Sequence, residues 1–251
     1  MIDLKGQRAL VTGGSRGVGA ATALMLAECG ADVGIGYRSR EREAQEVVRQ
    51  IADRGVRGFA HAADLSAPGG TESLFARASR ELGGLDIFVG NSGVWPVEDV
   101  AAGAMDDERW GRTMRENVDT MFTTTRAAIR AISDHGRLVL VSSTAGQRGE
   151  AGHADYAASK GAMISFVKSI AIELAPRDII ANCVAPGWID TEMCEQPFAG
   201  EGRGRIERSI PLGRIASARD IAGPIFFLCS ELARHITCEL LNVNGGSVLC
   251  G

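Results

Sequence analysis

The sequence predicts a doubly wound α/β fold, in which helices cover both faces of a parallel β-sheet. Short apolar runs alternate with longer helical stretches along all 251 residues. The apolar runs are mostly continuous, as expected for strands buried on both faces. A glycine-rich stretch, "VTGGSRGVGA" (11–20), joins the first apolar run to the first helical stretch. These observations together are typical of a chain of βαβ units.

The strands are expected where Val, Ile and Leu cluster. The candidates are 8–12, 32–37, 57–62, 85–91, 136–142, 179–185 and 239–244. Because a helical stretch separates each candidate from the next, neighbouring strands should run parallel, which gives a sheet of about seven strands.

Helices are expected in the intervals between the strands. They are predicted at 18–30, 39–55, 70–82, 106–133, 153–175 and 218–231. Gly30 can end the first helix, and Ser39 is the candidate N-cap of the second. The chain has no proline- or serine-rich linker and no internal repeat, so we expect one domain over residues 1–251.

One segment interrupts the alternation. Residues 188–213, "WIDTEMCEQPFAGEGRGRIERSIPLG", follow the sixth predicted strand and include the glycine-rich, charged stretch "AGEGRGR". This composition predicts a mobile segment. Because ligands bind beyond the carboxyl ends of the strands in open α/β sheets, we expect a substrate lid here, with a plain surface loop as the alternative.

The composition argues against several classes of protein. The chain is 45% apolar and 23% charged, and its net charge of −4 is unlike that of a nucleic-acid-binding protein. Its six cysteines form no C-x-x-C pair and no metal-ligand spacing with histidine, so we expect reduced thiols and no metal site. The sequence shows no signal peptide and no uncharged apolar stretch of about 18 residues, so we expect a cytoplasmic protein without a membrane partner.

The glycine-rich stretch predicts a nucleotide-binding loop. Gly13, Gly14, Gly17 and Gly19 follow the first strand and open the first helix. Glycine allows a tight turn and a close backbone approach to a pyrophosphate, and a helix N-terminus favours negative charge. A glycine pattern alone is weak, but its place between a strand and a helix indicates dinucleotide binding.

The carboxyl end of the second strand indicates which dinucleotide binds. An acidic residue there would bind the ribose 2′-hydroxyl of NAD. Asp32 begins the strand and is at the wrong end, whereas the carboxyl end reads "YRSR" (37–40). Arg16 of the glycine loop can face the same place. Guanidinium groups and a hydroxyl, with no carboxylate, suit a 2′-phosphate, so the expected cofactor is NADP(H).

A tyrosine and a lysine four residues apart form the candidate reaction centre. In "DYAASKGAM" (155–163), Tyr156 and Lys160 share one helix face. A nearby ammonium lowers the pKa of a tyrosine from about 10, which makes the phenol a usable acid or base. Ser143 ends the fifth strand, and its hydroxyl can hold a carbonyl oxygen beside Tyr156. Because side chains alternate along a strand, only one of Ser142 and Ser143 can face the cleft.

A series of motifs, in order along essentially the whole chain, resembles those of the short-chain dehydrogenase/reductase family in its single-domain branch. They are TGGSRGVG (12–19), AADLS (62–66), GNSG (90–93), RENVDTMF (115–122), SSTAG (142–146), YAASK (156–160), VAPGWIDT (184–191) and NVNGG (242–246). The resemblance implies a Rossmann-type fold. The one departure that we note is Ser92, where the family usually has alanine.

The resemblance also implies an NADPH-dependent reaction at a carbonyl or secondary alcohol. Tyr156 donates the proton and Ser143 positions the carbonyl. Lys160 lowers the pKa of the tyrosine and binds the nicotinamide ribose, and Asn117 holds a water that links Lys160 to solvent. Tyr156 and Lys160 thus also contact the cofactor. The other implied cofactor contacts are Gly13, Ser15, Arg16, Gly17, Val18, Gly19, Tyr37, Arg38, Ser39, Asp64, Leu65, Asn91, Ser92, Gly93, Pro186, Gly187, Ile189 and Thr191.

The substrate class is left open by the sequence. Residues 210–246 resemble 3-oxoacyl-acyl-carrier-protein reductases, which implies 3-oxoacyl thioesters of carrier protein or CoA and a place in fatty acid biosynthesis. Polyol, sugar, steroid and quinone oxidoreductases have similar segments and stay as alternatives. A catalytically silent dinucleotide sensor is the alternative from another class. The resemblance further implies a homotetramer with the helices at 106–133 and 153–175 in its interfaces.

Two features bear on the substrate. Of the two basic positions at which such reductases dock their acidic carrier, Arg177 matches one, whereas Asp134 stands at the other and would repel the carrier. Two tryptophans follow turns at the cleft mouth and suit an apolar or ring-shaped carbonyl compound, or else pack under the lid. The candidate substrate contacts are Trp95, Ser143, Gln147, His153, Tyr156, Trp188 and Met193.

Overall fold

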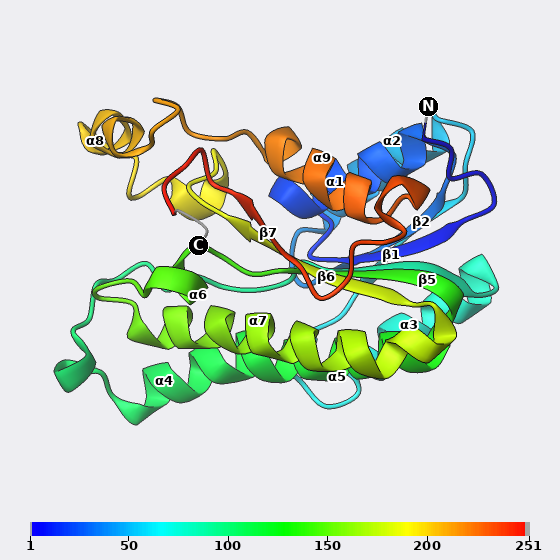
Figure 1. Cartoon of the computed structure of the whole chain (residues 1–251), viewed down its shortest axis with the longest axis horizontal. Coiled ribbons are helices and arrows are strands. Elements are labelled where there is room, and N and C mark those ends of the chain that lie inside the picture. Colours follow the sequence, from blue (N-terminus) through cyan, green and yellow to red (C-terminus); the bar gives the residue numbers. More distant parts are fainter. Residues whose placement is uncertain (1, 249–251) are drawn as a thin grey trace.

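The computed structural model of the chain describes residues 2–248 and places seven parallel strands in one sheet of order β3-β2-β1-β4-β5-β6-β7 (Figure 1). The strands are β1 Arg8–Thr12, β2 Asp32–Tyr37, β3 Gly58–Ala62, β4 Leu85–Gly90, β5 Ile132–Val141, β6 Ile180–Pro186 and β7 Leu240–Val243. The predicted fold class is confirmed. Strand β5 begins at Ile132 and not at 136, because Ile132 already pairs with Leu85 of β4 ahead of the polar stretch that follows it.

Helices lie on both faces of this sheet. They are α1 Gly17–Glu28, α2 Glu41–Ala52, α3 Gly70–Leu82, α4 Asp107–Met114, α5 Thr120–Ala131, α6 Ala145–Arg148, α7 Ala154–Leu174, α8 Gly202–Ser209 and α9 Ala218–Leu228. Figure 1 shows α1, α2 and α9 above the sheet, and α3, α4, α5 and α7 below it.

The two faces of the sheet form two separate cores. Val11 and Val89 belong to the cluster that packs against α1, α2 and α9, whereas Leu10 and Phe88 belong to the cluster that packs against α3, α5 and α7. Neighbouring residues of one strand thus serve opposite cores. This is why the strands read as continuous apolar runs.

Two expectations about the helices were wrong. The second helix begins after Arg40, which makes no side-chain cap, and Ser39 is turned to the cavity described below and caps nothing. The helix expected over 106–133 is two helices, α4 and α5, joined by a π-helical turn at Arg115–Asp119. Such turns are common at functional sites, and this one contains the fully buried Asn117.

The crevice of the fold opens between β1 and β4, where the strand order reverses. The loops after these strands are tied together. Asn91 Nδ2 donates to the carbonyls of Thr12 and Gly13 at 3.1 and 3.2 Å. The hydroxyl of Thr12 accepts from the backbone N–H groups of Asn91 and Ser92, both at 3.0 Å. The glycine loop is therefore held against the GNSG loop at the edge of the crevice.

The segment 188–213 contains a short 3₁₀ turn, Glu192–Cys194, and helix α8. The sequence predicted a mobile glycine-rich stretch where α8 forms. The helix is held because Ile206 is buried and Arg203 forms an ion pair with Asp190 at 2.6 Å. Figure 1 shows α8 set apart from the two helical layers. Within residues 2–248, no helix is long and apolar enough to span a membrane.

Candidate active site

A cavity of about 840 Å³ lies at the carboxyl end of the sheet and brings most of the predicted site together. Every predicted cofactor contact except Gly19 lines it. So do Ser143, Tyr156 and Lys160, together with Trp95, Trp188 and Met193. Asn117, Gln147 and His153 do not line the cavity.

The glycine loop is shaped to receive a phosphate. Gly13 and Gly17 have φ values of 64° and 55°, which residues with a side chain rarely adopt. Helix α1 starts at Gly17 with no side-chain cap, so its first N–H groups stay available to an anion. Gly19 has a packing role instead: a Cβ there would lie 2.2 Å from the carbonyl oxygen of Gly13.

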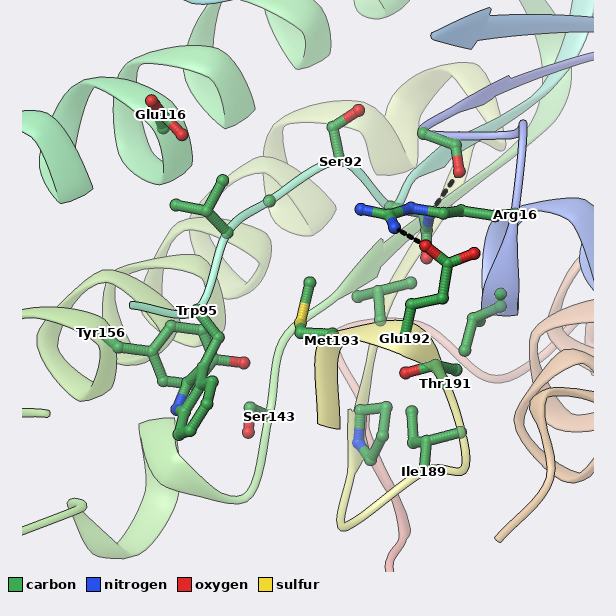
Figure 2. Close-up of a pocket in the computed structure, with 18 of the residues that line it drawn as sticks. Arg16, Ser92, Trp95, Glu116, Ser143, Tyr156, Ile189, Thr191, Glu192 and Met193 are labelled. Carbon is green, nitrogen blue, oxygen red and sulfur yellow. Dashed lines mark hydrogen bonds and ion pairs between the residues drawn. The ribbon is translucent and has the colours of Figure 1, made fainter. Parts of the chain in front are cut away.

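Two carboxylates meet the arginines at the carboxyl end of β2. Figure 2 shows Glu192 paired with Arg16. Glu192 also pairs with Arg40 at 3.0 Å, and Glu116 pairs with Arg38 at 3.5 Å. The sequence analysis looked for an acidic residue only at the carboxyl end of the second strand. It missed both glutamates because they come from distant segments of the chain. The two ion pairs of Glu192 join side chains that are 43–48% exposed, so water screens them and another anion can replace the carboxylate.

The hydroxyls of Ser143 and Tyr156 meet in the wall of the cavity. Ser143 hydrogen-bonds to the buried Tyr156 hydroxyl, and Figure 2 shows the two side chains together beside Trp95. Ser142 points the other way and donates to the carbonyl of Lys160 at 2.8 Å. Of the two serines, the structure thus turns Ser143 toward the tyrosine, as the family resemblance implied.

The ammonium of Lys160 lies under the tyrosine ring and not against its hydroxyl. Its Nζ atom is 5.8 Å from the centre of the Tyr156 ring and donates to the carbonyl of Val141 at 2.9 Å. Both side chains are buried. Burial raises the pKa of Tyr156, against a smaller lowering by the hydrogen bond from Ser143, and burial lowers the pKa of Lys160 to about 8.

The predicted lowering of the Tyr156 pKa by Lys160 is therefore wrong for this structure. The loss of water around the phenol outweighs every favourable interaction. The ammonium gives its hydrogen bond to Val141 and does not offset this loss.

The buried side chain of Asn117 forms hydrogen bonds beside the reaction centre. The N–H of Val94 donates to Asn117 Oδ1 at 2.8 Å, and Asn117 Nδ2 donates to the carbonyl of Val94 at 3.0 Å and to Ser159 Oγ at 2.9 Å. A Cβ built on Gly93 would lie 3.1 Å from Asn117 Oδ1 and 3.3 Å from Lys160 Nζ. The amide and the ammonium thus converge on the GNSG loop.

The two tryptophans line the cavity, and Trp188 itself begins the segment 188–213. Trp95 and Trp188 meet edge to face with ring centres 6.4 Å apart, and Trp188 lies 5.9 Å from Phe198 of that segment. Both tryptophans therefore line the cavity and pack as structure, and their contact with a substrate stays a prediction. Behind them, His153 is buried and stacks on Trp95 at 4.5 Å.

Several further cavity residues were not among the sequence predictions, and four of them carry a charge or a thiol close to the predicted site. These four are Arg148, Glu150, Glu192 and Cys194. The first two precede Tyr156 within the same short segment, so their nearness to the active-site motif was a usable signal. Among residues 2–248 the five cysteines are free, and Cys194 is the one that lines the cavity, while Cys250 lies outside the described residues.

Comparison with known proteins identifies the family. A family model described as enoyl-(acyl carrier protein) reductase matches residues 13–247. The 3-oxoacyl-[acyl-carrier-protein] reductases of Escherichia coli and Vibrio cholerae are 38% and 39% identical to the chain over 247 residues, which is 98% of each protein. The chain belongs to the short-chain dehydrogenase/reductase family.

Solved structures agree with this assignment. A blue fluorescent protein from a metagenomic library, in complex with NADPH, has a TM-score of 0.92 and 36% identity, with 98% of this chain and 100% of that one covered. A short chain dehydrogenase from Burkholderia cenocepacia, in complex with NADP, has a TM-score of 0.91 and 36% identity, with 97% and 98% covered.

Proposed function

We propose that the protein is an NADPH-dependent reductase of 3-oxoacyl thioesters. The observation that carries the proposal is the convergence, in one cavity, of a phosphate-binding loop, an arginine cluster and the paired hydroxyls of Ser143 and Tyr156. The 3-oxoacyl reductases of two bacteria match the chain from end to end, which supports this substrate class.

The donor set fits a phosphorylated dinucleotide. The uncapped start of α1 and the left-handed glycines suit the pyrophosphate, and Arg16, Arg38 and Arg40 suit a 2′-phosphate. When bound there, NADPH supplies the hydride. Solved relatives with NADPH and NADP support the same cofactor.

The side chains divide the remaining work of carbonyl reduction. The Ser143 hydroxyl donates to the substrate carbonyl and fixes its position, and Tyr156 delivers a proton to the same oxygen as negative charge develops. The raised pKa of Tyr156 keeps the phenol protonated at neutral pH, which is the form that reduction needs. Oxidation of the alcohol needs the phenolate, so it should be favoured at higher pH.

Lys160 and Asn117 act around this pair. At its lowered pKa of about 8, Lys160 is still mostly protonated at neutral pH, and its ammonium beside the Tyr156 ring is available to bind the nicotinamide ribose. The side chain of Asn117 is used by Val94 and Ser159, and its main-chain carbonyl accepts from the N–H of Thr120. The second lone pair of this carbonyl is the acceptor that would hold the predicted water.

Turnover of NADPH with acetoacetyl-CoA, measured beside sugars, quinones and steroid ketones, tests the proposal. We expect the thioester to be preferred. Tyr156→Phe should lower kcat by about 10²–10⁴-fold, since it removes the general acid, while NADPH still binds. A silent dinucleotide sensor predicts no effect of this substitution. Activity on a ring ketone with none on the thioester would refute the substrate class.

Free CoA thioesters are favoured over carrier-bound ones. Arg177 forms an ion pair with Asp134 at 2.8 Å and donates to the carbonyls of Ile129 and Ile132 at 3.1 and 2.7 Å. Its charge is therefore already matched and is a poor attraction for an acidic carrier. Asp134→Arg should lower the KM for acetoacetyl-carrier protein and leave that for acetoacetyl-CoA unaffected.

A homotetramer through α5 and α7 is the proposed assembly. The outer surface of these helices exposes Phe122 and Ile172, which are 44% and 73% accessible, and Phe122 meets Phe166 edge to face at 6.3 Å. Sedimentation at micromolar concentration should give a tetramer, and Ile172→Asp a smaller species. The single domain over 1–251 and the cytoplasmic location stay predictions.

A further inference from the structure

A carboxylate lies at the substrate end of the cavity. Glu150 precedes α7 and lines the same cavity as Ser143 and Tyr156. Its side chain is only 18% exposed. The indole Nε1 of Trp95 donates to Glu150 Oε1 at 3.3 Å, which holds the carboxylate against the aromatic wall. The substrate-binding end of this site is therefore not purely apolar.

The charged groups around Glu150 leave its charge facing the cavity. His153 Nδ1 lies 3.9 Å from Glu150 Oε1 and 3.3 Å from Asp99 Oδ1, so the imidazole is shared between two carboxylates. The Asp99 side chain is 86% exposed and Arg148 is also exposed, so water screens both charges. Compared with Asp99 and Arg148, Glu150 is therefore the charged side chain with little water around it.

The charge of Glu150 reaches the reaction centre. Its negative charge contributes to the raised pKa of Tyr156, because a second anion nearby disfavours the phenolate. A substrate whose ketone oxygen bonds to Ser143 and Tyr156 places its neighbouring atoms in the same space. A carboxylate on those atoms would face Glu150 where little water separates like charges.

We propose that Glu150 is a specificity-determining residue, which admits carbonyl compounds whose 3-oxoacyl group is uncharged, such as thioesters and esters, and rejects 3-oxo acids with a free carboxylate. The inference rests on the proposed function only in that the reaction is a carbonyl reduction. It adds a rule on charge that the apolar wall alone would not impose, since an ester and its acid differ little in shape.

The test uses a matched pair of ketones, ethyl acetoacetate and acetoacetate, with NADPH. In the wild-type protein, kcat/KM should favour the ester strongly. Glu150→Gln keeps an oxygen for the Trp95 indole and removes the charge, and it should reduce the ester-to-acid ratio by about tenfold or more. Asp99→Asn is the control, because its exposed charge also neighbours His153, and it should change the ratio by less than about twofold.

A purely structural role gives a different result. If Glu150 only holds Trp95, the substitution lowers the activity on both ketones in parallel and leaves their ratio unchanged, which would overturn the inference. If neither of these ketones nor acetoacetyl-CoA is reduced, the proposed function fails. The charge rule is then decided by binding of the two compounds to the NADP⁺ complex, read from tryptophan fluorescence, with the same tenfold shift in the ratio of Kd values required.

Discussion

Lys160 should make the stability of the protein depend on pH in a defined window. Burial lowers its pKa from 10.5 to about 8. Between these two values the unfolded chain binds more protons than the folded chain, so the free energy of unfolding rises as the pH rises. Below this window the buried ammonium imposes its full cost. Near pH 10 most of that cost has been removed.

The magnitude follows from the size of the shift. The lowering from 10.5 to about 8 corresponds to about 3 kcal/mol in total. About 2.5 kcal/mol of this should develop between about pH 7 and pH 10. For a chain of this length, that difference moves the Tm by about 5–10 °C. Cys183, which burial holds at a pKa of about 12, keeps its proton throughout.

Lys160→Met isolates the effect, because methionine has a similar length and no charge. The Tm of each protein is measured by thermal unfolding at a series of pH values. We expect the variant to have a higher Tm than the wild-type protein at pH 7, and we expect this difference to disappear as the pH approaches 10. A difference between the two Tm values that stays constant across the range would refute the reasoning, since it would mean that the ammonium is not desolvated.

Four further substitutions test other parts of the structure. Glu192→Gln frees its two arginine partners for a phosphate, so the Kd for NADPH should fall by about two- to fivefold and that for NADH less; equal changes would count against a 2′-phosphate site. Gly19→Ala forces a Cβ against the glycine loop and should lower the free energy of unfolding by about 1–3 kcal/mol in urea titrations. Gly204→Ala, within α8, where a Cβ would meet only the end of the Arg208 side chain at 3.4 Å, should raise it by about 0.5–1 kcal/mol, and similar losses for both would contradict the packing argument. Phe198→Ala removes the contact with Trp188 and should raise the KM for the thioester by about three- to tenfold with the Kd for NADPH unchanged, whereas an unchanged KM would show that the segment 188–213 is no lid.

Much of the fold was readable because its signals are local. Each strand of this parallel sheet is buried on both faces, and its apolar run appears directly in the sequence. The position of the glycine loop could likewise be predicted, because Gly13 and Gly17 adopt backbone angles that other residues avoid. The exact ends of elements were less readable. The π-helical turn at Arg115–Asp119 has no composition that separates it from the helices on either side.

The candidate site was predictable wherever its residues follow a strand end or share a helix face. Ser143, Tyr156 and Lys160 meet this condition, and the cavity contains all three. Glu192 does not meet it, because its partner Arg16 lies far away along the chain. A contact of this kind depends on how the segment after β6 folds back over the sheet.

The sequence by itself determined the parallel sheet, the nucleotide loop and the family to which the chain belongs. These features depend on periodicity, on glycine at particular turns and on spacing within one element. Only the tertiary structure decided the ionisation and the charges of the site. A pKa depends on how much water surrounds a group and on which charges face it, and both are set by segments distant in sequence. For this reason Tyr156, which the sequence predicted to have a pKa lowered by Lys160, has a raised pKa. For the same reason the proposed role of Glu150 could be inferred only from the structure.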